Sequence, residues 1–312
     1  MSLAKMRNAS PVIQQLDDTQ LTSAQVQVSV LRLDLMYPEL SGNKWYKLKY
    51  NLQQARIEGK STLLTFGGAY SNHIYATAAA GKLYGFSTIG IIRGERPPAL
   101  NHTLQFTEAQ GMQLHFISRE DYRAKASPSF AEQLRQKFGS FYQFPEGGTN
   151  ELAVKGCSEI LPCPLKYDVV CASVGTGGTL AGLLVQLAGK KQLLGFPALK
   201  GGQFLYDEIN QLTKDYNNQL YTNYQLITNY HFGGYAKANA ELVDFINDFY
   251  QQHQIPLDPV YNGKLFYGLF DLVKQQYFTS GTRILAIHTG GLQGVAGFNE
   301  RFRDKRLRIL ES

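Results

Sequence analysis

Residues 41–52 read SGNKWYKLKYNL, and the rest of the chain is organised around this stretch. Gly42 can adopt backbone angles that other residues avoid. Asn43 is a favoured helix N-cap, because its side-chain oxygen accepts a backbone N–H of the first turn. Apolar residues then recur at helical spacing (Trp45, Leu48, Leu52). We therefore expect a helix that is capped by Asn43 and carries Lys44 in its first turn.

The position of Lys44 suits a reactive amine. The first turn is the positive end of the helix dipole, which favours the neutral form of the amine and lowers its pKa. A lysine that forms a Schiff base needs such a lowered pKa. On this stretch alone an ordinary solvated lysine is the simpler interpretation. Whether Lys44 is instead a reactive amine depends on the rest of the chain.

Composition is typical of a globular protein, with 312 residues, 44% hydrophobic and 18% charged. The sequence contains no apolar run of the roughly 20 residues that a membrane span needs. The N-terminus lacks the apolar core of a signal peptide, so we expect a cytoplasmic protein. Its three cysteines (Cys157, Cys163, Cys171) have neither disulfide-framework nor zinc spacing, and we expect them to fill the core.

The chain is mildly basic, with a net charge of +6. Its Lys and Arg residues are dispersed except in residues 301–308, which we interpret as the solvated face of a short helix. A nucleic-acid binder is therefore a distant alternative. The mild positive charge instead suits anionic ligands such as a phosphate and a carboxylate.

Strand and helix patterns alternate twice along the chain. Residues 1–24 are expected to form loop or short helix, and residues 26–35 an extended segment. Apolar strands are expected first at 62–66, 87–92 and 113–117, and then at 167–173, 192–196, 225–228 and 283–287, with helices between them. Such alternation predicts an α/β fold with two doubly wound, open parallel sheets and a cleft between them. We expect a small domain at residues 47–150, inserted into a large domain of residues 1–46 and 151–312.

A glycine-rich loop follows the buried strand of the second unit. Its residues are Gly175, Thr176, Gly177, Gly178 and Thr179, and they open a helix. Backbone N–H groups and the helix dipole there point at an anion, usually a phosphate. The loop lacks the lysine of the G-x-x-x-x-G-K-[ST] nucleotide pattern. A phosphate site is favoured over a bare turn.

Three more polar loops follow expected strands: residues 71–73 (SNH), 261–262 (YN) and 288–291 (HTGG). In open α/β sheets the carboxyl ends of the strands line the ligand crevice. These loops, the glycine-rich loop and Lys44 should therefore meet in one cleft.

Together these motifs resemble a known family. Their order and spacing are similar to those of the 1-aminocyclopropane-1-carboxylate deaminase / D-cysteine desulfhydrase family. The motifs that carry this resemblance are Gly42-Asn43-Lys44, GGxxSNH at 67–73, GTGGT at 175–179, DPVYxGK at 258–264 and HTGG at 288–291. This family belongs to the fold-type II, tryptophan synthase β-like enzymes that use pyridoxal 5′-phosphate. The resemblance covers roughly residues 31–292.

The resemblance implies roles for individual residues. Lys44 would carry the cofactor as a Schiff base and move protons at the substrate Cα. Asn72 would bond the cofactor O3′, the Gly175–Thr179 loop would hold its phosphate, and Ser71 would help to seat the substrate carboxylate. Two tyrosines would complete the catalytic set (Tyr261 and, as a looser match, Tyr235). The resemblance also implies a homodimer without metal, nucleic-acid or membrane partners.

Two departures from the family pattern bear on the reaction. Asn262 stands where ring-opening deaminases carry an acidic residue, and Thr289 replaces their Leu and matches the desulfhydrases. We assign both residues to cofactor binding. A neutral amide near the pyridine nitrogen holds its proton less firmly than a carboxylate, so the cofactor would be a weaker electron sink.

This favours a PLP-dependent lyase or deaminase that catalyses β-elimination from a small amino acid, like D-cysteine desulfhydrase, and yields pyruvate, ammonia and sulfide. Three alternatives of the same fold stay open: 1-aminocyclopropane-1-carboxylate deaminase, serine/threonine dehydratase and racemase. A remote alternative is a catalytically silent protein that binds the cofactor or an amino acid.

Overall fold

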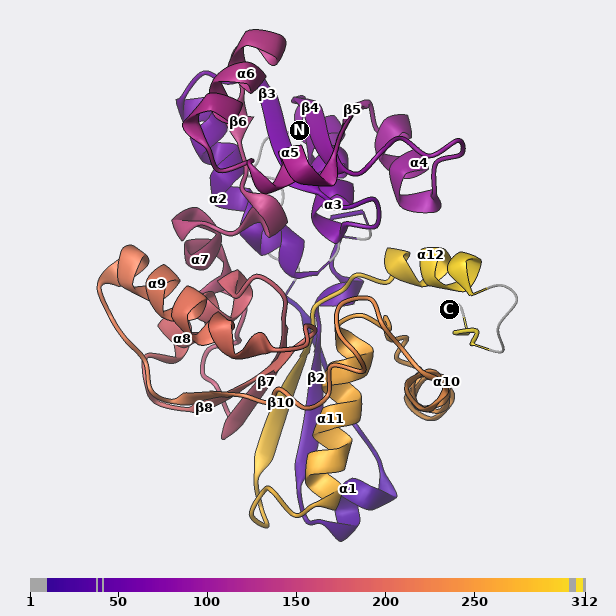
Figure 1. The fold of residues 1–312 in the computed structure, drawn as a ribbon. Coiled ribbons are helices and arrows are strands. Elements are labelled where there is room, and N and C mark those ends of the chain that lie inside the picture. The colour runs from indigo at the N-terminus through magenta and orange to yellow at the C-terminus, as the bar shows by residue number, and fades with distance from the viewer. Residues whose placement is uncertain (1–9, 38, 41, 303–306, 311–312) are drawn as a thin grey trace.

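The computed structural model describes residues 10–37, 39–40, 42–302 and 307–310. Its strands form two sheets (Figure 1). The six-stranded sheet has the order β1-β2-β10-β7-β8-β9, and the four-stranded sheet has the order β5-β4-β3-β6. The strands are β1 (Val12–Gln15), β2 (Gln27–Arg32), β3 (Thr62–Gly67), β4 (Ser87–Arg93), β5 (Met112–Ile117), β6 (Tyr142–Gln143), β7 (Val169–Val174), β8 (Gln192–Pro197), β9 (Tyr224–Leu226) and β10 (Arg283–His288).

Helices alternate with these strands, and polar side chains set many of their ends. The α-helices are α1 (Thr19–Ser23), α2 (Asn43–Ile57), α3 (Asn72–Tyr84), α4 (His102–Ala109), α5 (Arg119–Arg123), α6 (Pro128–Phe138), α7 (Glu151–Cys157), α8 (Gly178–Leu187), α9 (Leu205–Asn217), α10 (Ala240–His253), α11 (Asn262–Lys274) and α12 (Gln293–Arg301). The described residues also include the 3-10 segments η2 (Leu33–Leu35), η3 (Glu146–Gly148) and η4 (Gly202–Phe204). Helix α4 begins at His102, because Asn101 caps it by accepting the backbone N–H of Leu104.

The expected α/β architecture with two parallel sheets is confirmed, with one correction at an edge. Strands β2, β10, β7, β8 and β9 pair in parallel, as do β3, β4, β5 and β6. Strand β1, however, pairs antiparallel with β2. Its segment was expected to be loop or short helix, and its mostly exposed residues gave no strand pattern. The expected helical face at residues 301–308 lies partly outside the described residues, and α12 ends at Arg301.

Strands β3 to β6 build one sheet, and the strands before and after them build the other. This is the distribution that an inserted small domain requires, and Figure 1 shows the four-stranded sheet above the six-stranded one. The domain boundaries themselves, at residues 46/47 and 150/151, stay a prediction.

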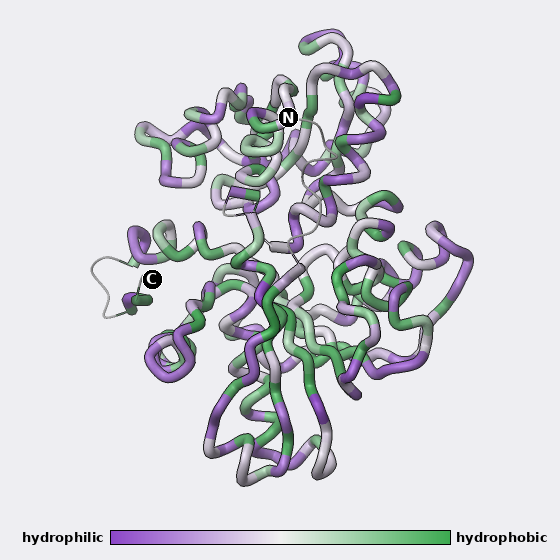
Figure 2. The backbone as a smooth tube through the Cα atoms, turned by 180° about the vertical axis from the view of Figure 1, so that it is seen from behind, coloured by the Kyte–Doolittle hydropathy of each residue, from purple (hydrophilic) through white to green (hydrophobic). Residues whose placement is uncertain are grey.

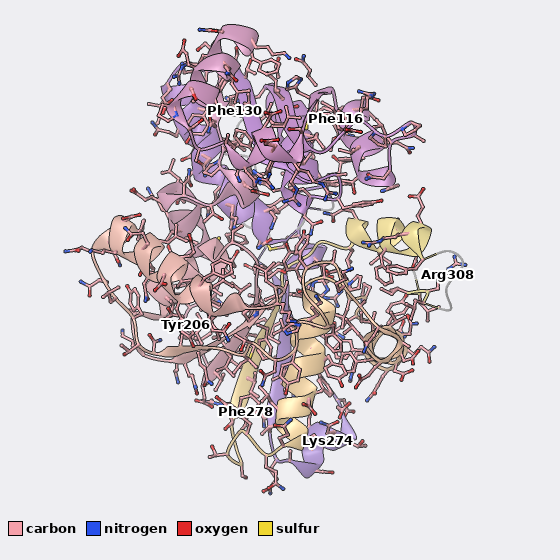
Figure 3. All side chains as sticks on the ribbon, viewed as in Figure 1. Phe116, Phe130, Tyr206, Lys274, Phe278 and Arg308 are labelled. Carbon is pink, nitrogen blue, oxygen red and sulfur yellow. The ribbon has the colours of Figure 1, made fainter. Side chains whose placement is uncertain are left out.

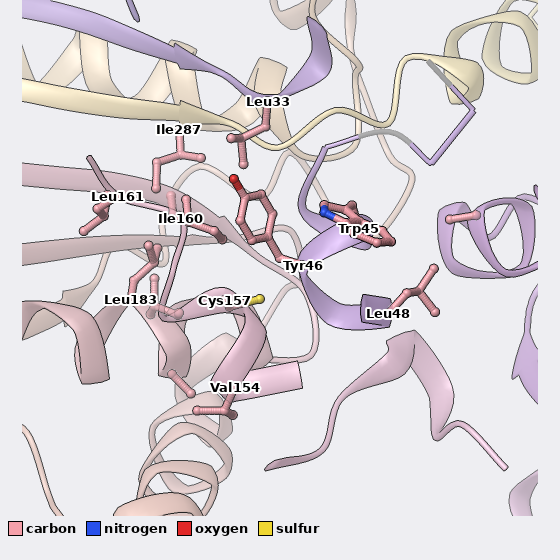
Figure 4. Close-up of a cluster of buried hydrophobic side chains, with 14 of the residues drawn as sticks. Leu33, Trp45, Tyr46, Leu48, Val154, Cys157, Ile160, Leu161, Leu183 and Ile287 are labelled. Carbon is pink, nitrogen blue, oxygen red and sulfur yellow. The ribbon is translucent and has the colours of Figure 1, made fainter. Parts of the chain in front are cut away.

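Each sheet packs apolar side chains on both faces, as expected for parallel sheets covered by helices. In β10, Leu285 and Ile287 face the cluster that includes α2, α7 and α8, while Ile284 and Ala286 face the cluster of α10 and α11. Figure 4 shows part of the first cluster, in which Ile287 lies near Tyr46 of α2. Figure 2, in which the backbone is coloured by residue hydropathy, shows hydrophobic residues (green) gathered in the middle of the part that contains the six-stranded sheet.

Two smaller clusters cover the faces of the four-stranded sheet. Figure 3 shows aromatic side chains spread over both parts, with Phe116 and Phe130 above and Tyr206 and Phe278 below. The expectation that all three cysteines fill the core is correct for Cys157 and Cys171, which are buried. It is wrong for Cys163, which is exposed.

Candidate active site

A pocket lies where the carboxyl ends of strands from both sheets face each other. Its lining residues come from α2, the start of α3, η3, the end of β7 and the loop after it, α8, the loop after β9, the start of α11 and the loop after β10. They are Asn43, Lys44, Lys47, Ser71, Asn72, His73, Gly147, Ser173, Val174, Gly175, Thr176, Gly177, Thr179, Leu180, Tyr235, Tyr261, Thr289, Gly290 and Gly291. Parallel strands put polar loops at one edge of each sheet, which explains why residues so distant in sequence meet here.

Gly42 positions the start of α2 against the loop after β10. Its φ is +66°, and a Cβ at this position would lie 1.9 Å from the carbonyl oxygen of Thr289. The next backbone N–H, that of Asn43, donates to the same oxygen at 3.1 Å. Gly42 is also the helix cap, which corrects the expectation that Asn43 caps the helix. Only a residue without a side chain fits this approach.

Lys44 is in the first turn of α2 and points into the pocket. Its Nζ donates to Oδ1 of Asn43 at 3.1 Å. Burial, and next the positive charge of Lys47, lower the pKa of Lys44 to about 7. The expected lowering of the pKa is therefore present, but its main cause is desolvation of the charged amine. A neutral amine at Lys44 is a nucleophile for an aldehyde.

The glycine-rich loop lies across the pocket from α3 and opens α8. Gly177 has φ +81° and caps α8, which starts at Gly178. Thr179 accepts a hydrogen bond from Asn43 Nδ2 at 2.9 Å, so the loop is tied to the start of α2. The N-terminus of α8 points its free N–H groups at the pocket, which is the arrangement of an anion site.

Lys47 adds a cation to this anion site. Its Nζ is within 2.9 Å of Oγ1 of Thr149, 3.1 Å of the Gly147 carbonyl oxygen and 3.3 Å of Oγ1 of Thr176. The side chain is buried, and burial lowers the pKa of Lys47. Gly178 makes room for it, since a Cβ there would be 3.3 Å from Nζ. Sequence reasoning missed Lys47, although its spacing of three from Lys44 puts both on one helix face.

The N-terminus of α3 forms a further polar wall. Ser71 caps the helix, and its Oγ accepts the backbone N–H of Ile74 at 3.3 Å. Oδ1 of Asn72 accepts a hydrogen bond from Nε2 of Gln293 at 2.7 Å. His73 bonds Thr65 through Nε2 at 2.8 Å, and its buried Nδ1 has no hydrogen-bond partner among the described residues.

His73 stays neutral in this wall. Burial, and then the charges of Lys44 and Lys47, hold the pKa of His73 well below its usual value. The unpaired nitrogen of this uncharged ring is free to form one hydrogen bond with a polar ligand. The sequence pattern had included His73 only as part of a motif, with no role of its own.

Two tyrosines close the opposite side of the pocket. The hydroxyl of Tyr261 is 3.4 Å from that of Tyr235, and the ring planes meet at 70°. Burial raises the pKa of both phenols, so both are protonated at neutral pH. The loop that bears Tyr235 is anchored by Lys264, whose Nζ donates to the Gly234 carbonyl oxygen at 2.7 Å. The Tyr261 hydroxyl donates its one hydrogen to the Tyr235 hydroxyl, so Tyr235 is the phenol whose hydrogen is left for a ligand.

Asn262 lies behind the pocket wall. Its Nδ2 donates at 2.7 Å both to Oδ2 of Asp258 and to the Gly290 carbonyl oxygen. Its Oδ1 accepts from the backbone N–H of Thr289 at 3.0 Å and from the Thr289 hydroxyl at 3.2 Å. The amide has no hydrogen left to donate. A direct contact of Asn262 with a ligand was expected from sequence, whereas the structure brings Thr289 and Ser173 to the pocket at this point.

The other site residues expected from sequence meet in the pocket, except Gly178. Lys44, Ser71, Asn72, Tyr235, Tyr261 and Thr289 line it together with Gly175, Thr176, Gly177 and Thr179. Gly178 lies beside it as the first residue of α8. Lys47, Gly147 and Ser173 also line the pocket, although no role was expected for them, and so does Asn43, which was expected only as a helix cap.

This donor set fits pyridoxal phosphate. A neutral amine, an anion site with a helix N-terminus and a cation, and an asparagine amide line one pocket. The amine can bond the cofactor's aldehyde, the anion site can hold its phosphate, and the asparagine amide can bond its ring oxygen. The unpaired Nδ1 of His73 is one more hydrogen-bonding position in this wall. Among the described residues, no group of three or more His, Cys, Asp or Glu side chains could hold a metal ion.

Comparison with known proteins agrees with this interpretation. Residues 16–290 match the family of pyridoxal-phosphate dependent enzymes. The chain is 31% identical over 292 residues to the mitochondrial bifunctional D-cysteine desulfhydrase/1-aminocyclopropane-1-carboxylate deaminase of Arabidopsis thaliana, which covers 85% of this chain and 72% of the relative. It is 29% identical over 295 residues to the D-cysteine desulfhydrase of Serratia proteamaculans, with 88% of this chain and 89% of the relative covered.

A solved structure of a homologue of 1-aminocyclopropane-1-carboxylate deaminase shares the fold. The TM-score is 0.83 at 27% identity, and 96% of this chain and 94% of that chain are covered. Fold and site thus define a pyridoxal-phosphate dependent enzyme of fold type II. Within this class, the chain belongs to the 1-aminocyclopropane-1-carboxylate deaminase / D-cysteine desulfhydrase family. The family and the cofactor expected from the sequence motifs are confirmed.

No helix among the described residues is long and apolar enough to span a membrane. The cytoplasmic location and the homodimer stay predictions.

Proposed function

We propose that the enzyme eliminates the β-substituent of a small amino acid, in the manner of a D-cysteine desulfhydrase. With D-cysteine and water as reactants, the products are pyruvate, ammonia and hydrogen sulfide. The family supports a lyase or deaminase acting on an amino acid, because the two relatives above are named for such activities. The choice of substrate is the part that we propose.

One observation carries this choice: none of the described lining residues is an aspartate or a glutamate. The wall with Ser173 and Thr289 offers hydroxyl groups, and the hydroxyls are 3.3 Å apart. The carboxylate of Asp258 behind this wall accepts four hydrogen bonds, from the backbone N–H groups of Val260, Tyr261 and Asn262 and from Nδ2 of Asn262. A carboxylate is the group that would keep the cofactor ring nitrogen protonated.

The demands of the two candidate reactions differ accordingly. Pyridoxal phosphate, when bound, withdraws electrons from the amino acid and makes its Cα proton acidic. Removal of that proton followed by loss of a thiol needs only brief stabilisation of the negative charge at Cα. Opening an unactivated carbon ring requires a stronger electron sink. A pocket lined by neutral hydroxyls therefore favours elimination.

The residues of this chain would divide the work as follows. Lys44 would bond the cofactor aldehyde and then, as a neutral amine, take the Cα proton. Ser71 and the N-terminus of α3 would hold the substrate carboxylate, because that helix end attracts anions. The hydroxyl of Tyr235, which accepts a hydrogen bond from Tyr261, would donate a hydrogen bond near the leaving group.

Other residues would hold the cofactor. The Gly175–Thr179 loop, with the ammonium of Lys47, would bind the phosphate. Asn72 would donate to the ring oxygen at position 3, and Thr289 would face the ring, with Asn262 behind it.

A second candidate, 1-aminocyclopropane-1-carboxylate deaminase, is favoured by the bifunctional name of the Arabidopsis relative. One assay separates the two. The purified holoenzyme is given D-cysteine, L-serine, D-serine and 1-aminocyclopropane-1-carboxylate, and sulfide, pyruvate and 2-oxobutyrate are measured. We expect sulfide and pyruvate from D-cysteine at the highest rate. Faster 2-oxobutyrate formation from the cyclopropane substrate would overturn the proposal, and a visible absorption band without any turnover would indicate a silent binding protein.

A further inference from the structure

Gln293 makes a hydrogen bond that joins two parts of the molecule at the pocket. Its Nε2 donates to Oδ1 of Asn72 at 2.7 Å. Gln293 is the first residue of α12, directly after the loop that contains the lining residues Gly290 and Gly291, and Asn72 is the first residue of α3. The bond thus connects the C-terminal helix to the helix that begins at the pocket wall.

Helix α12 is held firmly against the segment that precedes α3. A Cβ at Gly297 would be 2.8 Å from two ring atoms of Tyr70, so α12 and this segment are in close contact. Helix α12 also packs against α4, and Figure 1 shows it below α3 and α4, between the levels of the two sheets. Gln293 therefore reaches Asn72 from a supported position, and its own side chain is half-buried.

The bond decides which end of the Asn72 amide faces the pocket. An asparagine side chain has one oxygen that accepts and one NH2 group that donates. The oxygen is engaged by Gln293, and the NH2 group lies against Gly291, where a Cβ would be only 2.6 Å from Nδ2. Because Gly291 lines the pocket, the donor end of the amide is the end that points toward it.

We infer that Gln293 is a positioning residue: it turns Asn72 so that its NH2 group, not its oxygen, is offered to the ring oxygen of bound pyridoxal phosphate. This inference rests on the proposed role of Asn72 in holding that oxygen. The ring oxygen carries negative charge, and a hydrogen bond to an anion is stronger than one between neutral groups. An asparagine turned the other way would present an acceptor and repel it.

Two substitutions test the inference on the holoenzyme. In Gln293→Glu the ionised carboxylate can only accept, so Asn72 must turn its NH2 group toward position 293 and its oxygen toward the cofactor. In Gln293→Leu the Asn72 amide loses the hydrogen bond that orients it, but nothing forces the amide to turn the other way. Gln53→Glu, on an exposed part of α2, makes the same chemical change away from the pocket and serves as the control.

The readouts are the equilibrium dissociation constant for pyridoxal phosphate and the ratio of the visible to the near-ultraviolet band of the bound cofactor. The visible band belongs to the form with a negative ring oxygen. We expect Gln293→Glu to weaken binding about tenfold and to lower the band ratio, Gln293→Leu to give a smaller change of the same sign, and Gln53→Glu to leave both unchanged. Thermal unfolding of each variant shows whether it is folded.

The variant Asn72→Ala separates this inference from the proposed function. If Asn72→Ala changes the band ratio and both folded Gln293 variants leave it unaltered, Gln293 has no positioning role and the function stands. If Asn72→Ala itself leaves binding and spectrum unchanged, Asn72 does not hold the ring oxygen, and the proposed role of Asn72 fails together with the inference.

Discussion

Nδ2 of Asn43 donates a hydrogen bond of 2.9 Å to Oγ1 of Thr179, across 136 positions of sequence. Asn43 is the first residue of α2, and Thr179 is in the first turn of α8. The same asparagine accepts from Nζ of Lys44 through its oxygen. One side chain therefore sets the reactive amine and the anion site at a fixed separation, as a ligand with an aldehyde and a phosphate requires.

The lowered pKa of Lys44 predicts how the apoenzyme takes up its cofactor. Only the neutral amine attacks an aldehyde. With a pKa of about 7, half of the amine is neutral at pH 7. A lysine at its usual pKa would be roughly 0.03% neutral at that pH. The rate of cofactor uptake should thus rise through pH 7 and level off above pH 8, measured by the growth of the visible band after rapid mixing. A rise centred near pH 10 would contradict the lowered pKa of Lys44.

Lys47 should matter for cofactor affinity far more than its neighbour Lys49. Replacing Lys47 by Met removes a cation from the anion site, and loss of a charge-assisted hydrogen bond weakens binding about 10- to 100-fold. Lys47→Met should also move the midpoint of the uptake profile upward, because the charge of Lys47 lowers the pKa of Lys44.

Lys49→Met is the matched control, since Lys49 pairs with the exposed carboxylate of Glu159. Its effect on the dissociation constant should be below about threefold, as for surface ion pairs in general. Equal weakening by the two substitutions would show that Lys47 has no special part in phosphate binding.

Asn262→Glu should destabilise the fold. The added carboxylate would lie beside the carboxylate of Asp258 and the carbonyl oxygen of Gly290, both now 2.7 Å from Nδ2. An uncompensated buried charge costs about 3–5 kcal/mol. We expect the free energy of unfolding, measured in urea, to fall by that amount.

The control for this substitution is on the same helical segment. Gln275 also donates to a carboxylate, that of Asp271, at 2.7 Å, but it is exposed. Gln275→Glu should lower the free energy of unfolding by less than about 1 kcal/mol. If the Asn262→Glu protein were as stable as the parent, the hydrogen bonds of this amide to Asp258 and Gly290 would not hold it in place.

Much of the fold follows from local sequence patterns. Strands such as Val169–Val174 are apolar on both faces, and polar loops follow them, so a parallel sheet with a crevice at the strand ends could be inferred. Strand β1 could not be inferred, because its exposed residues carry no alternation and only its pairing with β2 makes it a strand.

Site residues could be predicted from the sequence where a single short segment contains the whole motif. Lys44 and the Gly175–Thr179 loop are of this kind. Gly147 reaches the pocket only through the packing of distant elements, so sequence spacing gave no signal for it. Ser173 is at the carboxyl end of β7, directly before the glycine-rich loop, and that position is a signal that could have identified it. Asn262 differs from the expectation in its placement: its motif suggests a ligand contact, whereas its amide bonds Thr289 behind the wall and the preceding residue, Tyr261, lines the pocket.

The central claim is that Lys44 bears the cofactor. The direct measurement is reduction of the holoenzyme with borohydride, followed by proteolysis and mass spectrometry of the labelled peptide. We predict one pyridoxyl group per chain, attached to Nζ of Lys44, and no label in a Lys44→Ala protein. A label on Lys47, Lys49 or the buried Lys264 would contradict the account.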